Sequence, residues 1–548
     1  MAAESSFRSA RSPKILYIGA ECKPFSMVGG VGDVVGEMPV ALKNAGYDVR
    51  VVTPGYSSID AKHIAPAPDN PTGDPVDFQV AGDPRLGDQQ ARTVAYKSGK
   101  LGDVPVDFVV NDTYFGTRID PRYGKPYVDS RGVPFQDDAL RFSFFAKAVL
   151  PLIERHAPDI VHVNDWTMGY LLGWMKLKGQ LDTPRGPATV LTIHNIGYQG
   201  NMPRRQIAGW DMEALANDPR TSGPFTDPHP RWDNVNPLRL AMEIADVTNT
   251  VSPNYMREML EPEAPWRFFE GGKGLEGTAK TLRDQGRLFG ILNGIQYENA
   301  QPTEADFQAM LQKKAEMRKR FAAYFKQPHG LLVGFVGRCV TQKFQLLAEK
   351  LRDKSVLEHI LDIPGVNVAL LATGDPAYES FMANIGLARF AGRMEYGDVL
   401  YAGRRGNYVA TVAFDRERAR QTWLASDLFL MPSLFEPCGI TQLQSMELAT
   451  PPLVRGTGGL RDTVVDYRQS RATGFVCDGT TREAVLQSVV DGVWTAKDLK
   501  ENDPDAFLQM QRRAFNQRFT WEKALPGYES LYAEALERRA QRAGSPTS

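Results

Sequence analysis

The chain has 548 residues, of which 42% are hydrophobic and 24% are charged, and its formal net charge is −1. This length exceeds what one hydrophobic core normally spans, so two domains of ordinary size are expected. The balanced charge argues against nucleic acid or an anionic membrane as a partner. The apolar runs have the length of strands, so no transmembrane helix is expected.

The N-terminal segment MAAESSFRSARSPK contains no apolar run of the kind that a secretory signal needs. We therefore expect a cytoplasmic protein, with a plastid as the alternative for a plant-like source, because the Ser and Arg content would suit a transit peptide. The four cysteines are widely spaced and have no C-x-x-C spacing, which indicates reduced thiols. The seven histidines include no H-x-x-x-H pair of the kind that binds a metal. We expect neither a metal nor another resident cofactor.

Strand-like apolar runs alternate with amphipathic stretches along almost the whole chain. The expected strands of the first half are KILYIGA, VRVVTP, VDFVV, DIVHV, ATVLTIHN, VTNTVS and LFGILNG. Those of the second half are LLVGFVGR, NVALLATG, YVATVAF, DLFLMPS, PPLVRG and GFVCDG. Continuous β-branched runs are typical of parallel strands buried on both faces. We therefore predict an α/β protein with two doubly wound, Rossmann-like domains that face a cleft.

The same pattern gives the expected domain boundaries. We predict a first domain over 13–300, a second over 328–510, and a polar helix over 305–325 that leads into the second domain. C-terminal helices over 511–540 are expected to cross back to the first domain, and the ends 1–12 and 541–548 are expected to be flexible. Ligands of open α/β sheets bind beyond the carboxyl ends of the strands, so the residues there are the candidates for a site.

A glycine-rich loop, FSMVGGVGDVVGEMP, follows the first strand. Gly29 and Gly30 would let backbone amides approach an anion at the start of the next helix. The alternative is a tight turn that holds no ligand. The second strand, VRVVTPGY, ends without the acidic residue that a dinucleotide site needs, which counts against a hydride-transfer enzyme.

Polar residues follow several other strands. His194 ends one strand within HNIGYQG, where it either shapes a sugar or phosphate pocket or serves as a structural histidine. Arg338 and Lys343 follow the first strand of the second domain, where two cations suit a pyrophosphate, unless they are ordinary solvent-exposed charges. Glu436 and the loop at Thr457 follow later strands, the latter with glycines that suit an anion. Together these residues fit a sugar nucleotide.

The chain resembles the bacterial glycogen synthases and plant starch synthases, which are retaining glucosyltransferases of family 5 with the two-domain GT-B architecture. The resemblance spans about residues 14–532. It rests on the motifs GAECKPFSMVGGVGDVVG, QDDALRFSFFAKA, HVNDW, HNIGYQG, NTVSPNYMRE, GILNGI, DLFLMPSLFEPCGITQ and TGGLRDTV, in that order.

The resemblance implies that glucose moves from ADP-glucose, or UDP-glucose in some members, to the non-reducing end of an α-1,4-glucan such as glycogen or starch. It implies retention of the anomeric configuration and no metal. The implied catalytic residues are Arg338, Lys343, Glu436 and Asp137. The implied donor-binding residues are Gly29, Gly30, Asp33, His194, Asn293, Cys438, Gly439, Thr457, Gly458, Gly459 and Leu460. The implied pocket residues are Asn164, Asp165, Trp166, Tyr198 and Gln199.

Four positions depart from the family pattern. Met27 replaces a lysine that reaches the diphosphate in the family, and Thr167 replaces a histidine near the reacting sugar. Phe344 stands where the family has glycine, and Gln296 where it has aspartate. Loss of one well-aimed polar stabiliser typically costs about 3 kcal/mol in the transition state. The departures leave three alternatives: an active synthase, an impaired relative that binds glucan or regulates a true synthase, and a transferase with another donor or acceptor.

Overall fold

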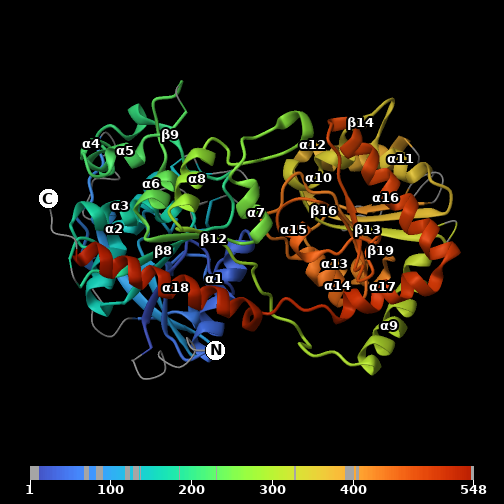
Figure 1. Cartoon of the computed structure of the whole chain (residues 1–548), viewed down its shortest axis with the longest axis horizontal. Helices are drawn as coiled ribbons and strands as arrows, with labels where there is room; N and C mark the ends of the chain where they lie inside the picture. Colours follow the sequence, from blue (N-terminus) through green and yellow to red (C-terminus); the bar gives the residue numbers. More distant parts are fainter. Residues whose placement is uncertain are drawn as a thin grey trace.

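The computed structural model describes residues 12–66, 73–81, 90–117, 124–127, 135, 137–183, 185–229, 231–325, 327, 329–388, 400–402 and 407–544. Most of the ends expected to be flexible lie outside this part of the chain, namely residues 1–11 and 545–548. Two α/β domains lie side by side, the first coloured blue to green and the second yellow to orange (Figure 1). The predicted fold class is confirmed.

The first domain is built on one large sheet with the order β12-β11-β8-β7-β1-β2-β6-β5-β3. Its main strands are β1 (Lys14–Ile18), β2 (Asp48–Pro54), β5 (Thr93–Leu101), β6 (Val104–Val110), β7 (Ile160–Asn164), β8 (Ala188–Ile193), β11 (Val247–Thr250) and β12 (Leu288–Gly290). The short strands are β3 (Ala65–Pro66), β4 (Asp74–Pro75), β9 (Met202–Pro203) and β10 (Asn234–Val235). The strands from β12 to β6 are parallel, whereas β5 and β3 extend the sheet in antiparallel fashion. All seven strands predicted for this half are present, and β5 is an addition to them.

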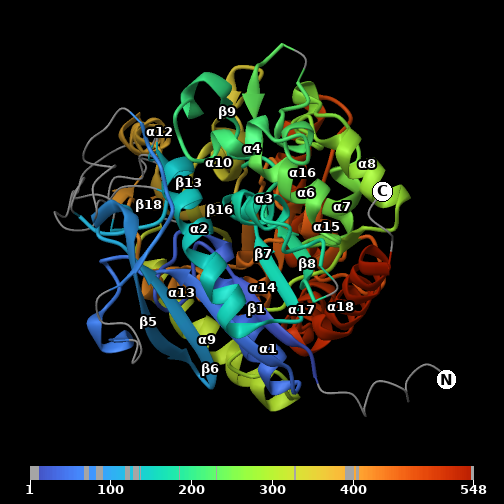
Figure 2. The same cartoon turned by 90° about the vertical axis from the view of Figure 1, so that its left-hand side faces the viewer.

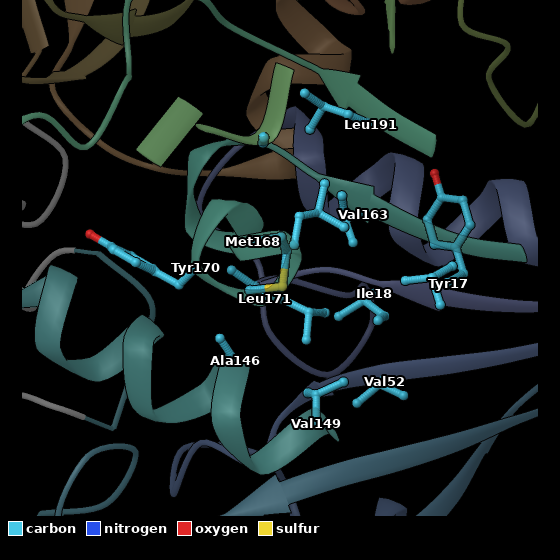
Figure 3. Packing of buried hydrophobic residues seen from close by; sticks show 14 of the residues in the cluster. Tyr17, Ile18, Val52, Ala146, Val149, Val163, Met168, Tyr170, Leu171 and Leu191 are labelled. Carbon is cyan, nitrogen blue, oxygen red and sulfur yellow. The ribbon is translucent and has the colours of Figure 1, made fainter. Parts of the chain in front are cut away.

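Helices cover this sheet and bury its apolar residues. They are α1 (Gly30–Asn44), α2 (Asp138–His156), α3 (Gly169–Leu177), α4 (Glu213–Asn217), α5 (Ser222–Phe225), α6 (Pro237–Ile244), α7 (Pro253–Glu258) and α8 (Glu276–Asp284). Figure 3 shows side chains of α2 and α3, among them Val149 and Leu171, between strand residues Ile18, Val52 and Val163. All five are fully or almost fully buried, so β1 and its neighbours form the rigid centre that positions the loops beyond them.

The second domain has a seven-stranded sheet with the order β17-β18-β16-β13-β19-β20-β21. Its strands are β13 (Leu331–Cys339), β16 (Val366–Gly374), β17 (Leu400–Ala402), β18 (Tyr408–Thr411), β19 (Leu428–Met431), β20 (Pro452–Arg455) and β21 (Phe475–Cys477), beside a short hairpin of β14 (Lys350–Leu351) and β15 (Lys354–Ser355). Its helices are α9 (Glu304–Ala322), α10 (Thr341–Ala348), α11 (Val356–Asp362), α12 (Pro376–Ala388), α13 (Arg416–Ala425), α14 (Thr441–Glu447), α15 (Gly458–Thr463), α16 (Arg482–Asn502) and α17 (Pro504–Asn516). Only β17 runs antiparallel among the paired strands of this sheet in the described part of the chain.

The chain crosses between the domains twice, and the two crossings are joined. The amide of Ile295, in the first crossing, donates to the carbonyl of Phe519, in the second, at 2.8 Å. The final helix, α18 (Trp521–Gly544), then lies along the first domain (Figures 1 and 2). The hydroxyl of Tyr532 on α18 is 2.9 Å from Nδ1 of His162 in β7. The predicted return to the first domain is therefore made by α18. The predicted boundary at residue 511 falls inside α17, and α17 packs on the second domain.

Candidate active site

The glycine-rich loop after β1 does hold an anion, and this anion belongs to the chain itself. The Glu21 carboxylate accepts a hydrogen bond from the amide of Gly29 at 3.0 Å and another from the amide of Val28. Gly29 is the residue before α1, and Gly30 is its first residue. Burial raises the pKa of Glu21 to about 7, while the two amides and the positive charge of Arg338 oppose this rise.

Met27 lies at the surface of this loop, with 38% of its area exposed. Lys23 does not fill the place of the missing family lysine, because its ammonium contacts Asp33 at 2.8 Å and Glu37 at 3.4 Å. Both carboxylates belong to α1, and that pairing keeps Lys23 on the helix surface. The glycine-rich loop therefore lacks a described lysine directed at a ligand, and Asp33 is already paired.

Arg338 is the cation that reaches across from the second domain. It is the penultimate residue of β13, its side chain is exposed, and its charge lowers the pKa of Glu21 in the first domain. No carboxylate forms an ion pair with Arg338 among the described residues. The facing loops also lie close together, since a Cβ added to Gly30 would be 3.7 Å from Cδ1 of Ile440.

Lys343 and Glu436 form an ion pair in the second domain. Lys343 lies in the first turn of α10, directly after β13, and Glu436 lies in the loop between β19 and α14. The hydroxyl of Ser433 donates to the same carboxylate oxygen at 3.1 Å. Because Glu436 is only 6% exposed, these two donors replace hydrogen bonds that its carboxylate would otherwise make with water. Arg338, Lys343 and Glu436 thus gather at the end of β13 that faces the first domain.

The ends of β7 and β8 form a buried hydrogen-bonded unit. Nε2 of His194 is 2.8 Å from Oδ1 of Asn164, and the amide of His194 donates to Asp165 at 2.7 Å. Burial lowers the pKa of His194 to about 3, so its ring is neutral at physiological pH. Burial raises the pKa of Asp165 to about 7, although backbone amides oppose the rise. These hydrogen bonds hold the loops after β7 and β8 in place at the edge of the candidate site.

The neighbouring pocket residues divide into supporting and exposed ones. Gln199 is buried and donates to the carbonyls of Ile196 at 3.1 Å and Lys273 at 3.0 Å, whereas Tyr198 is 62% exposed. Trp166 is partly buried and lies edge-on to Phe142. Thr167 is fully buried, with its hydroxyl 3.4 Å from the Asn164 carbonyl. The residue at the family's histidine position therefore points into the protein.

The loop before α15 contacts the first domain through Glu258. The carboxylate of Glu258, at the end of α7, accepts from the hydroxyl of Thr457 at 3.0 Å and from the amide of Gly458 at 2.9 Å. Burial raises the pKa of Glu258, and these hydrogen bonds oppose the rise. α7 and α15 face each other between the domains (Figure 1). The predicted anion-binding amide of Gly458 is thus occupied by a carboxylate of the other domain.

The other donor-binding candidates lie around this contact. The thiol of Cys438 is buried and interacts with the backbone of Asn293, which brings the two domains together. Gly439 has φ +78 and Gly458 has φ +44, a backbone conformation that favours glycine. Leu460 is fully buried, and the amide of Gly459 donates to the Glu436 carbonyl at 3.0 Å.

Three further positions, Asp137, Gln296 and Phe344, belong to none of the groups described above. Asp137 precedes α2 and is partly buried beside Asp138, whose carboxylate binds Arg141 at 2.7 Å. Gln296 is exposed in the first crossing between the domains. Phe344 is fully buried and packs edge-on to Phe335, so this departure from the family fills the core of the second domain.

Sequence reasoning missed Glu21 and Glu258. Glu21 follows the first strand directly, so the strand-end argument could have included it. Glu258 has no comparable signal, because its partners in the second domain are about 200 residues away in sequence. Within the described ranges, His, Cys, Asp and Glu form no group of three or more that could hold a metal ion. The helices in that part of the chain are too short or too polar to span a bilayer.

Two family models match separate parts of this chain, and known proteins match it over nearly its whole length. The model described as "Starch synthase catalytic domain" matches residues 14–281, and "Glycosyl transferases group 1" matches residues 410–492. A glycogen synthase of Geotalea daltonii is 31% identical, with 96% of this chain and 100% of that protein covered. A glycogen synthase of Streptococcus gordonii is 32% identical, with 95% and 100% covered.

Solved structures show the same fold. The catalytic domain of starch synthase IV from Arabidopsis thaliana, a structure bound to ADP and acarbose, superposes with a TM-score of 0.73 at 24% identity, covering 96% of this chain and 100% of that one. Sucrose-phosphate synthase from Thermosynechococcus elongatus gives 0.52 at 15% identity, covering 96% and 99%. With relatives above 30% identity along almost all of both chains, this protein belongs to the glycogen synthase and starch synthase family of hexosyltransferases.

Proposed function

We propose that the protein transfers glucose from a nucleotide diphosphate glucose, ADP-glucose or UDP-glucose, to the non-reducing end of an α-1,4-glucan with retention of configuration. The family membership supports this reaction class. The observation that carries the assignment to particular residues is the group of Arg338, Lys343 and Glu436, which lies at the carboxyl end of β13 opposite the glycine-rich loop.

The chemistry requires positive groups where the diphosphate leaves. Cleavage of the bond between the anomeric carbon and the phosphate oxygen leaves positive charge on the sugar and negative charge on the diphosphate. Fixed cations stabilise the developing negative charge, and this is usually the largest catalytic contribution. In our proposal Arg338 and Lys343 meet the diphosphate, and Glu436 holds Lys343 in place. The leaving phosphate accepts the proton of the attacking glucan hydroxyl on the same face of the sugar.

We further propose that the reaction needs no metal ion, because the two cationic side chains supply the charge that a metal would provide. We propose a cytoplasmic location, which the four free cysteines support, since reduced thiols are typical of that compartment. Both statements extend the sequence-based expectations.

The direct test is a transfer assay with purified protein, glycogen and radiolabelled ADP-glucose or UDP-glucose, with and without EDTA. We expect glycogen to become labelled at the same rate with and without EDTA, and we expect amylase to release that label. Absence of incorporation from both donors, with intact glucan binding, would identify an impaired glucan-binding relative instead. Loss of incorporation in EDTA alone would contradict the metal-free reaction.

A further inference from the structure

The first domain carries a hollow at its surface that the proposed transfer site does not use. Its volume is about 450 Å³, and it is lined by Pro203, Arg205, Arg231, Trp232, Asp233 and Asn234. This volume is within the range of small-molecule sites, roughly 300–1,000 Å³. The lining residues come from the antiparallel pair of β9 and β10, the turn after β9 and the loop before β10, and β9 lies near the top of the first domain in both views (Figures 1 and 2).

Trp232 supplies a flat, exposed ring. The side chain is 54% exposed, although tryptophan is usually buried in a folded domain. Its ring stacks on His229 with centroids 4.0 Å apart and planes inclined by 20°. The loop is anchored beneath by Asp227, which accepts from the His229 amide at 2.9 Å. The ring is therefore held in one orientation with a face available to a ligand.

The polar groups of the hollow are side-chain donors. The guanidinium groups of Arg205 and Arg231 are exposed, and no described carboxylate pairs with either, whereas Asp233 pairs with Arg204 at 3.2 Å. Two backbone amides beside the hollow are already paired: that of Arg204 donates to the Asp233 carbonyl at 2.8 Å, and that of Trp232 donates to the His229 carbonyl at 3.2 Å. These two amides are therefore not available to a phosphate.

We propose that this hollow, the Trp232 platform, is a docking site for an α-glucan chain, separate from the site of transfer. The inference rests on the proposed glucan acceptor. A glucose ring offers an apolar face of C–H groups that matches the tryptophan ring, and hydroxyl groups around it that match guanidinium donors. A nucleotide would instead favour an amide-lined phosphate cradle, and the amides of Arg204 and Trp232 beside the hollow are already paired.

The platform is connected to the loop that follows β8. Asp227 accepts from Nδ2 of Asn236 at 3.2 Å, and the same amide group donates to Oε1 of Gln199 at 2.7 Å. Gln199 belongs to the HNIGYQG loop of the candidate site. A polymer whose end occupies the transfer site continues over the protein surface, and a second contact on the same domain raises the effective concentration of that end.

The test uses the full chain and the variant Trp232→Ala, whose side chain is exposed and can be removed without disturbing the core. We expect retention by glycogen in affinity electrophoresis to weaken about tenfold. We also expect the KM for glycogen to rise about tenfold relative to the KM for maltotriose, because a short acceptor cannot reach both places. The variant Trp232→Phe, which keeps a ring, should recover most of the affinity.

Trp494→Ala is the matched control, because Trp494 is 47% exposed on α16 of the other domain and lies outside the hollow. Wild-type retention of Trp232→Ala by glycogen would overturn the proposal. Displacement of glycogen from the wild type by ADP would also overturn it. Loss of glycogen binding at high salt would do the same, because binding of a neutral glucan is insensitive to screening. If the wild type transfers no glucose but binds glycogen, and Trp232→Ala binds it more weakly, the docking site is supported and the transfer proposal fails.

Discussion

The carboxylate of Glu258 in the first domain accepts a hydrogen bond from the hydroxyl of Thr457 in the second, at a distance of 3.0 Å. The same carboxylate binds the amide of Gly458 at 2.9 Å and the side-chain amide of Asn254 at 2.8 Å. Hydrogen bonds to charged groups contribute roughly 1.5–3 kcal/mol each. One side chain thus joins α7 to α15 directly beside the proposed donor site.

We expect Glu258→Ala to open the contact between the domains. The neighbouring Cys438 is buried, and burial raises its pKa to about 12, so its thiol is protected in the closed arrangement. Alkylation of Cys438, followed by mass spectrometry, should therefore accelerate at least about tenfold in the variant. Glu261→Ala is the control, since Glu261 is exposed in the same segment. Equal alkylation rates in all three proteins would show that Glu258 does not hold the domains together.

Arg338→Ala should lower kcat by about 10²–10³, because it removes a cation aimed at the leaving diphosphate. The side chain is exposed, so the melting temperature should stay close to that of the wild type. Steady-state kinetics and thermal unfolding of the same preparation check both parts. Arg416→Ala, which removes an exposed arginine from α13, should retain wild-type turnover. A variant of Arg338 with normal kcat would place the leaving-group cation elsewhere.

Met27→Lys should raise turnover about tenfold or more, because it restores a cation to the glycine-rich loop. Lys23 cannot substitute while it contacts Asp33 at 2.8 Å. The new ammonium would also lie close to Glu21, since both Met27 and the Glu21 carboxylate border Gly32. Turnover at saturating donor measures the effect, and Met27→Leu controls for the change of shape. If Met27→Lys and Met27→Leu turn over equally fast, charge at this position is not limiting.

Stability should fall as the pH rises from about 4.5 to about 8, in part because of Glu270. Burial raises the pKa of Glu270 from 4.5 to about 8, although the buried hydroxyl of Tyr255, which donates to Glu270 at 3.1 Å, and the charge of Lys273 oppose the rise. In that window the folded protein holds a proton that the unfolded chain has lost, so each rise in pH favours unfolding, by at most about 1.4 kcal/mol per pH unit for one group.

Glu270→Gln removes this titration and should flatten the decline of the urea midpoint between pH 5 and pH 8. Glu21, Asp138 and Asp165, whose pKa values burial raises to about 7, should leave a residual decline. Glu261→Gln, at an exposed position, should follow the wild type. Parallel curves for wild type and Glu270→Gln would mean that Glu270 is ionised throughout this range.

The sequence by itself determined the order of the elements and the strand ends where polar residues gather. Every predicted strand is present, because burial on both faces imposes a local apolar pattern that is visible without the fold. The antiparallel strand β5 lacks such an apolar run, because partly exposed and buried residues alternate along much of its length. The motif residues after β7, β8 and β13 lie where the strand-end argument placed them.

Only the tertiary structure decided which charges meet. Glu258 binds Gly458, Lys343 binds Glu436, and the charge of Arg338 lowers the pKa of Glu21. All three interactions join residues far apart in the chain. The Trp232 platform likewise exists only because the pairing of β9 with β10 brings two loops together. Periodicity records whether a side chain is buried, whereas the partner of a buried charge depends on how whole elements and domains pack, and no local pattern carries that information.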